Sequence, residues 1–455
     1  MIGLLAHAIG GVRDLPIPLW LFYYGGAIVL VLSFVALGVL WRRPLLEGAD
    51  EGRPPDALQR VLLSKAAHVI AGGLGLGLLV LIFLAALVGE PSAGQNLSPT
   101  FVFVLFWVGL VFVVVGVGNV WPAFNPWRAG AGLVSWFWRE AGWSWGSGVS
   151  YPERLGWWPA ALLLFAFTAL ELAYTEPANP RALALAIFLY SWVTWVGMAV
   201  FGRDAWLRNG EAFSVYFDLL GRIAAFGRRR SDGRLVVRPP LSGLTVRDFP
   251  PGALAFVAVM LGSVAFDGYS RSSRWVEWRF ELEEPYVLDD PGLADLIVTG
   301  FNLAGLIAFV LIVALAYLTA IQVAKMVAPA RVSLSNAFLG SLVPIACAYV
   351  LAHYFSLLLI QGQVGITLMS DPFGFGWDLF GTADYQADPT IISPNTVWYF
   401  QVAVLVIGHV AGLMLAHDRA VALYDSPRTA IRTQYAMLAL MVVYTVGGLW
   451  LLSRG

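Results

Sequence analysis

The chain has 455 residues and a formal net charge of −1, and 59% of its residues are hydrophobic while only 13% are charged. Soluble domains are about 45–50% apolar and about 25% charged, so this composition excludes an ordinary soluble protein. The balanced charge gives no basic footprint for nucleic acid. The single cysteine, Cys347, excludes an internal disulfide and any CxxC metal site.

Ten apolar segments are long enough to cross the hydrocarbon core of a membrane, which takes roughly 20 helical residues. They cover residues 18–40, 67–88, 100–120, 157–175, 182–202, 251–268, 294–325, 332–361, 395–417 and 433–452. The sequence therefore predicts an all-α fold, a polytopic bundle of about ten transmembrane helices that forms a single domain over residues 1–455.

The orientation of this bundle follows from its basic residues. Of the 28 Lys and Arg, 22 fall in alternate loops that include 203–250. Because cytoplasmic loops carry the excess of Lys and Arg, loop 203–250 is predicted to be cytoplasmic, and loops 269–293 and 361–394 extracytoplasmic. Both termini are then extracytoplasmic, in a multi-pass protein of a bacterial-type inner (plasma) membrane.

Three loop segments carry their own structural signals. Apolar residues at helical spacing in 211–226, followed by three arginines, predict an amphipathic helix that lies in the cytoplasmic interface. Apolar and charged residues alternate in 276–283, and this alternation predicts a short exposed strand. Loop 361–394 combines Gly, Pro, aromatic residues and four Asp, which is typical of a lid or a ligand-contacting element, and equally of an ordered, inert cap.

Ionisable side chains inside predicted spans are costly, so each is a functional hypothesis. The candidates for catalysis are His353, His409, Asp267 and Glu171, and the first three are also candidate ligands for a divalent metal ion. An imidazole beside a carboxylate can act as a general base, a proton relay or a metal site. The alternative is that the histidines are hydrogen-bonded packing residues, and that Glu171 and Asp267 are solvated or pair with Arg181 and Arg271.

Further polar residues fall in the same, outward half of the predicted bundle. We expect them to line a polar cavity that opens to the outside beneath loop 361–394; they are Asn302, Tyr349, Ser356, Gln361, Gln363 and Gln401. His68 and His417 fall at the inner ends of their spans and are expected to be interfacial. Asn125 is expected to belong to a rigid turn.

Six stretches spread over the chain carry a family resemblance. They read GVRDLPIPLWLFYYGG (11–26), GNVWPAFNPWR (118–128), ALELAYTEPANPRALA (169–184), FDGYSRS (266–272), LAHYFSLLLIQGQ (351–363) and GHVAGLMLAHDRA (408–420). They resemble a family of prokaryotic membrane proteins that carries the name fenitrothion hydrolase. The resemblance implies cleavage of the P–O–aryl bond of an apolar organophosphorus ester.

Three functions remain open from the sequence. The first is an integral membrane hydrolase that acts on an apolar organophosphorus or related ester in the polar cavity. The second is a proton- or ion-coupled transporter or channel that uses the same cavity, and the third is a metal- or haem-binding membrane protein. The expected partners are the lipid bilayer and a small apolar molecule or ion, with an oligomer or partner subunit left open and no nucleic acid.

Overall fold

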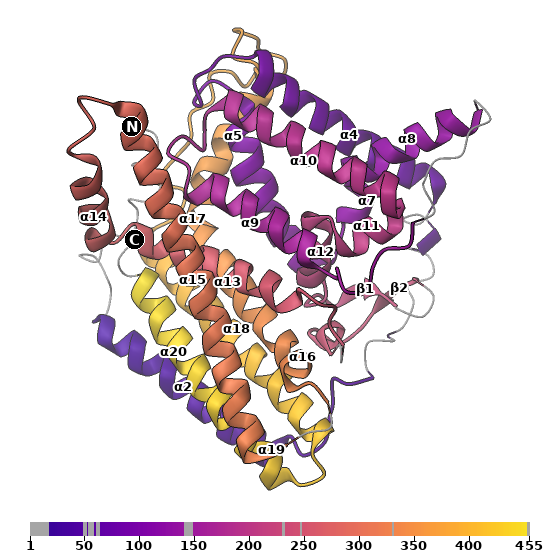
Figure 1. Cartoon of the computed structure of the whole chain (residues 1–455), viewed down its shortest axis with the longest axis vertical. Coiled ribbons are helices and arrows are strands. Elements are labelled where there is room, and N and C mark those ends of the chain that lie inside the picture. Colours follow the sequence, from indigo (N-terminus) through magenta and orange to yellow (C-terminus); the bar gives the residue numbers. More distant parts are fainter. Residues whose placement is uncertain are drawn as a thin grey trace.

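The computed structural model describes residues 18–48, 52, 59–60, 64–140, 149–229, 233–245, 248–329 and 332–452. Most of them are helical (Figure 1). The long helices are α2 (Leu19–Leu40), α4 (Lys65–Val88), α9 (Trp158–Leu172), α10 (Pro180–Phe201), α13 (Ala253–Ser270), α15 (Pro291–Val327), α17 (Val343–Ser370), α18 (Pro394–Leu423) and α20 (Tyr435–Leu452). One further long helix is composite, and consists of α5 (Leu97–Pro99), the π-helix η3 (Thr100–Gly109) and α6 (Leu110–Val117).

Shorter elements connect these helices. The α-helices are α7 (Trp121–Phe124), α8 (Pro126–Glu140), α11 (Arg203–Asn209), α12 (Ala212–Gly221), α14 (Ser273–Glu283), α16 (Leu334–Leu339) and α19 (Pro427–Thr433). Two 3₁₀ turns, η4 (Ser242–Leu244) and η5 (Gly340–Leu342), accompany them. The strands β1 (Phe226–Arg228) and β2 (Leu235–Val237) form an antiparallel hairpin in which Gly227 pairs with Val236.

Nine helices among the described residues are long and apolar enough to cross a membrane, so the chain is a multi-pass membrane protein. These nine coincide with nine of the ten predicted segments. The remaining segment forms α9, which at 15 residues is shorter than a typical span. The terminal residues 1–17 and 453–455 lie outside the described part of the chain.

Helix α17 lies at the centre of the bundle and packs against α13, α18 and η3 (Figure 1). Glycine lets α18 approach it closely, because a Cβ atom on Gly408 would stand 2.2 Å from the Cβ of Ala348. On one side of α17, helices α2, α15 and α20 pack around α18 and α13, and on the other side α4, α8 and α10 form a second group. Residues from sequence-distant spans therefore meet on α17.

Two loop predictions are wrong. Helix α12 covers much of the predicted amphipathic segment, but it does not lie on the surface: Phe217, Leu219 and Leu220 are fully buried, and it packs against α6, α9 and α17. Segment 276–283 is helical and belongs to α14. The side-chain hydroxyl of Ser272 accepts a hydrogen bond from the Trp275 backbone N–H and so begins that helix.

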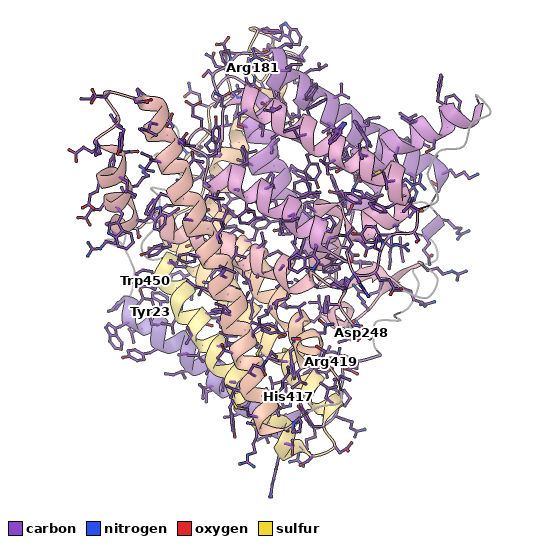
Figure 2. All side chains as sticks on the ribbon, viewed as in Figure 1. Tyr23, Arg181, Asp248, His417, Arg419 and Trp450 are labelled. Carbon is purple, nitrogen blue, oxygen red and sulfur yellow. The ribbon has the colours of Figure 1, made fainter. Side chains whose placement is uncertain are left out.

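Different polar side chains lie at the two ends of the bundle. In Figure 2, Arg181 lies at one end and His417 and Arg419 lie toward the other. Arg181 donates to the carbonyl oxygens of Ala86 and Gly89, at the end of α4, over 3.0 and 3.3 Å. It therefore caps a helix, and the predicted alternative in which it pairs with Glu171 is not what these hydrogen bonds show.

Candidate functional site

A buried carboxylate, Asp267, organises a polar cluster between α13 and α17. Its Oδ2 atom accepts hydrogen bonds from His353 Nε2 over 2.7 Å and from the Tyr354 hydroxyl over 2.8 Å. Its Oδ1 atom accepts from Arg271 Nη2 over 2.7 Å. We call these four residues the Asp267 cluster. Asp267 and Tyr354 are each only 3% exposed, so the cluster belongs to the interior of the bundle.

Helix geometry explains why these four side chains meet. Asp267 and Arg271 are four residues apart at the end of α13, and therefore share one face. His353 and Tyr354 are consecutive on α17, with ring centroids 4.7 Å apart, and both reach the same carboxylate oxygen. Since α17 continues to Ser370, His353 lies 17 residues before its end, or about 25 Å along the axis. The sequence-based boundary at residue 361 made it look shallower.

Asp267 determines which nitrogen of the His353 imidazole carries the hydrogen and which nitrogen is basic. A carboxylate accepts hydrogen bonds, so the Nε2 atom of His353 carries the hydrogen and the Nδ1 atom of a neutral ring is the basic nitrogen. Arg271 balances the charge of Asp267, which keeps the carboxylate available as an acceptor. The arrangement is that of a carboxylate-oriented base.

A second acidic side chain lies near the cluster. Glu171, one residue before the end of α9, interacts electrostatically with Asp267 and with Tyr354. The indole of Trp107 lies beside Glu171, although its buried Nε1 has no hydrogen-bond partner within the described part of the chain. A proton bound or released by Glu171 therefore changes the electrostatic environment of Asp267 and its partners.

Aromatic side chains cover this site. Phe266, immediately before Asp267, packs edge-on against Trp275 of α14, with centroids 5.3 Å apart. Trp275 stacks on Phe301 of α15 at 4.2 Å. Its Nε1 donates to Asn302 Oδ1 over 3.1 Å, so the polar group of Asn302 is part of this cover.

His409, the other candidate histidine, does not join the Asp267 cluster. Its Nδ1 donates to the Leu405 carbonyl oxygen over 2.8 Å, within its own helix α18. Its Nε2 is buried and has no hydrogen-bond partner among the described residues. The ring of Tyr349 lies beside it, at 5.9 Å between centroids, and the Tyr349 hydroxyl donates to the Tyr444 carbonyl oxygen.

The proposed metal ligands are therefore not assembled as predicted. Within the described residues, no three or more His, Cys, Asp or Glu side chains are grouped so that they could hold a metal ion. Asp267 and His353 could supply two ligands, and His409 forms separate contacts. Three of the residues predicted to line the polar cavity are half-buried and lie on two different helices, α17 and α18. They are Ser356, Gln361 and Gln401.

Gln363 anchors the long loop between α17 and α18, residues 371–393. Its Oε1 accepts from the Tyr385 hydroxyl over 2.9 Å and from the Asp388 backbone N–H over 3.0 Å. The loop also accepts hydrogen bonds from the turn after α4, where Glu90 N–H donates to the Phe373 carbonyl oxygen over 2.8 Å. These contacts hold the loop over the α4 end of the bundle.

The aspartates of this loop stabilise its turns. A hydrogen bond from the Ser370 hydroxyl, followed by one from the Ala383 backbone N–H, lowers the pKa of Asp378 from its ordinary value of 3.8. The Thr390 hydroxyl and backbone N–H lower the pKa of Asp388 in the same way. Asp371 accepts from the backbone N–H groups of Phe375 and Gly376. These contacts show that the loop is ordered.

Sequence reasoning missed a second buried cluster, around Asp418 of α18. Asp418 is fully buried, and it accepts hydrogen bonds from Trp41 Nε1 over 2.9 Å and from backbone N–H groups that follow α2. Those N–H groups belong to Leu45, Leu46 and Glu47. Arg419 forms an ion pair with the side chain of Glu47.

His417 belongs to this same cluster and is not interfacial, because it is only 2% exposed. Its ring nitrogens lie 3.0 Å from the Trp41 carbonyl oxygen and 3.1 Å from Gln434 Oε1. Consecutive polar residues 417–419 at the end of an apolar span were the available signal for the cluster. Its contacts anchor residues 41–47 and provide no open site.

A third buried carboxylate, Glu211, caps α12. It accepts from the backbone N–H groups of Phe213 and Ser214 over 2.9 and 2.8 Å, and from the hydroxyl of Tyr190. Asn125 Nδ2 donates to Glu211 Oε2 over 3.3 Å. Asn125 therefore links the turn before α8 to the buried helix, which agrees with the rigid turn predicted there.

Comparison with known proteins adds no further constraint. No protein-family model matches the chain, and neither the curated proteins nor the solved structures contain a match.

Proposed function

We propose that this chain is a membrane-embedded hydrolase in which His353 is the general base and Asp267 orients it. The observation that carries the proposal is the 2.7 Å contact between His353 Nε2 and Asp267 Oδ2 inside an apolar bundle. The substrate class, an apolar organophosphorus or related ester, comes from the resemblance of the six sequence stretches. Such a substrate dissolves in the bilayer that surrounds the helices.

The reaction would be a simple displacement. The Nδ1 atom of His353 removes a proton from water as the water oxygen attacks phosphorus, and the P–O–aryl bond breaks. The aryloxide leaves and takes up the proton, which gives a phenol and a dialkyl phosphorothioic acid. Asp267 stabilises the imidazolium that forms in between, and Tyr354 helps to hold Asp267 in place.

The proposed orientation places loop 371–393 outside the cell. It rests on the excess of basic residues in the alternate loops, which include the segment that contains α11, α12 and the β-hairpin. The Asp267 cluster would then be reached from the outer side or laterally from the bilayer.

The test is release of the coloured nitrophenol from fenitrothion by the full chain in lipid nanodiscs. We expect turnover by the unmodified protein and a loss of about 10²–10⁴-fold in His353→Gln, the range that a general base contributes. His68→Gln is the matched control, since His68 lies on α4 and bonds to the Ser64 carbonyl oxygen of its own helix start. Absence of turnover in the unmodified protein, or equal turnover in the two variants, would refute the proposal.

A second candidate function, proton-coupled transport, is favoured by the electrostatic interaction of Glu171 with Asp267. Ionisable residues inside a membrane are typical of proton pathways. In sealed liposomes with a pH-sensitive dye inside, this function predicts proton uptake along an imposed gradient that is lost in Glu171→Gln. The hydrolase proposal predicts no such flux.

A further inference from the structure

A large apolar cavity lies in the second group of helices, apart from the Asp267 cluster. Its volume is about 510 Å³, within the range of about 300–1,000 Å³ that is usual for small-molecule sites. The walls come from α4, η3, α9 and α10, and α7, α8 and α12 contribute to one end. The lining contains none of Asp267, His353 and Tyr354.

One end of the cavity is built from aromatic rings. Phe106 packs edge-on against Phe213 with centroids 4.8 Å apart, and Trp127 lies 4.9 Å from Tyr190. Trp121 lies 5.3 Å from Phe106 and completes this aromatic end. Ring faces and edges carry opposite partial charges, so such a surface accommodates another ring better than a saturated chain.

Two rings of the aromatic end form hydrogen bonds to residues that do not line the cavity. The Trp127 indole Nε1 donates to Ser191 Oγ over 2.9 Å, and the Tyr190 hydroxyl donates to Glu211. Because these polar atoms are paired with the protein, the rings present their apolar surfaces to the cavity. No Asp, Glu, Lys, Arg or His is among the residues that line it. The cavity is therefore suited to an uncharged ligand.

The cavity communicates with the apolar surface of the bundle. Three lining residues are also strongly exposed: Leu78 of α4 is 42% exposed, Phe124 of α7 is 41% exposed and Leu189 of α10 is 49% exposed. Helices α4 and α10 are both long enough to cross a membrane. We therefore expect the opening among these side chains to face hydrocarbon, so that a ligand would enter from the bilayer and not from water.

The wall formed by η3 departs from regular helix geometry. Residues Thr100–Gly109 form a π-helix of ten residues, and Phe101, Leu105 and Phe106 from this segment line the cavity. A π-helix is rare and occurs frequently at functional sites. Here it directs aromatic and aliphatic side chains of one span toward the cavity.

We propose that this cavity is a binding site for a neutral, ring-containing apolar molecule that is dissolved in the bilayer. The site is assigned from its volume, its uncharged lining, its aromatic end and its opening toward lipid. The assignment does not depend on the chemistry of the Asp267 cluster.

The test uses benzophenone, a neutral two-ring compound that inserts into neighbouring C–H bonds under light. The full chain is labelled in nanodiscs and the modified peptides are mapped by mass spectrometry. We expect modification to be concentrated in α4, η3 and α10. We also expect Ala186→Phe, which fills the cavity from α10, to reduce this modification by about tenfold, equal to 1.4 kcal/mol of binding. Modification spread evenly over the lipid-facing helices would overturn the proposal.

Leu185→Phe is the matched control, because Leu185 is on the same helix, is 59% exposed and does not line the cavity. If Ala186→Phe does not fold, Ala166→Phe fills the cavity from α9 and replaces it. Labelling that is equal in the cavity variant and the control would refute the site. Competition distinguishes a ring ligand from a lipid chain: we expect excess cyclohexylbenzene to suppress labelling, and suppression by hexadecane to the same degree would contradict the ring specificity.

Discussion

Asp267 and His353 are 86 residues apart in the sequence, and yet Oδ2 of the first lies 2.7 Å from Nε2 of the second. The same carboxylate bonds to Arg271 and to Tyr354, so three side chains depend on one acidic group. A buried carboxylate that satisfies three donors is costly to replace, since each donor would lose a charged acceptor.

The first prediction concerns the contribution of Asp267 to stability. In Asp267→Asn, the amide oxygen can face either Arg271 or the pair His353 and Tyr354, while the amide NH₂ faces the other side, where it meets donors. We expect the free energy of unfolding to fall by about 2 kcal/mol, less than the ~3–5 kcal/mol for a fully buried pair because Arg271 retains some solvent contact. Thermal unfolding in detergent measures the change.

Glu277→Gln is the control for this experiment. It removes the ion pair between Arg274 and Glu277, whose side chains are 66% and 57% exposed, and exposed pairs contribute about 0–1 kcal/mol. Equal destabilisation in Asp267→Asn and Glu277→Gln would contradict the central position given to Asp267.

The second prediction concerns the anchor at Asp418. Asp418→Asn brings an amide NH₂ against N–H groups of Trp41 and Leu45, or against those of Leu46 and Glu47. We expect a loss of about 3 kcal/mol in stability, and faster proteolysis of residues 41–48, because these N–H groups lose their acceptor. The exposed Asp425 provides the matched substitution, and Asp425→Asn is expected to leave both measurements unchanged.

The third prediction tests the close contact of α17 and α18. In Gly408→Ala the new methyl would stand 2.2 Å from the Cβ of Ala348 and 2.8 Å from the Pro344 carbonyl oxygen, so the helices must separate. We expect a destabilisation of about 1–3 kcal/mol in thermal unfolding. Gly447→Ala on α20 meets nothing within 4 Å and is expected to be neutral or slightly stabilising. A Gly408→Ala protein as stable as Gly447→Ala would argue against this packing.

The fourth prediction is a pH dependence of loop 371–393. The pKa of Asp378 is lowered in the folded loop, first by the Ser370 hydroxyl and then by the Ala383 N–H. The unfolded loop therefore binds the proton more readily, and the stabilisation is complete above the ordinary pKa of 3.8 and is lost as pH falls through the lower, folded value. Trp377, inside the loop, reports the transition by its fluorescence.

Ser370→Ala removes the largest cause of this lowering and so brings the folded pKa closer to 3.8, and we expect its transition to be complete at a higher pH than in the unmodified chain. In Asp378→Asn the contribution of this group should vanish at every pH. A transition at the same pH in Ser370→Ala and in the unmodified protein would show that the Ser370 hydroxyl does not set it.

The sequence predicted the transmembrane architecture because lipid selects for long apolar helices, whatever their partners. The predictions were wrong for segments whose conformation or burial depends on contacts with helices that are distant in the sequence. Segment 276–283 alternates like a strand, but Trp275 packs against Phe266 and Phe301 and holds this segment in a helix beside α15. Segment 211–226 has helical spacing, and only its packing against α6, α9 and α17 explains why it is buried.

The candidate site was predicted only in part, because the sequence shows which residues in the spans are ionisable but not which of them come into contact. Asp267 and His353 were recognised because ionisable groups inside spans are rare, whereas their direct contact depends on how α13 meets α17. His409 has the same signal in the sequence, but its Nδ1 atom donates to the Leu405 carbonyl oxygen of its own helix, away from the Asp267 cluster. Asp418 and Glu211 were missed because acidic residues at the ends of apolar segments are normally solvated, and no local pattern shows the N–H groups that approach them.

Burial of α12 has a consequence for biogenesis. Its packing partners α6 and α9 precede it in the chain, but α17 begins about 120 residues after α12 ends. During synthesis, the apolar surface of α12 that α17 later covers therefore stays open until α13, α15 and α17 itself have been made, a long-range closure that is slow and exposed to misassembly. Truncation before α17 should leave a protein whose inserted helices still display an uncovered, aggregation-prone face, and this interval is where assistance during membrane assembly would matter most.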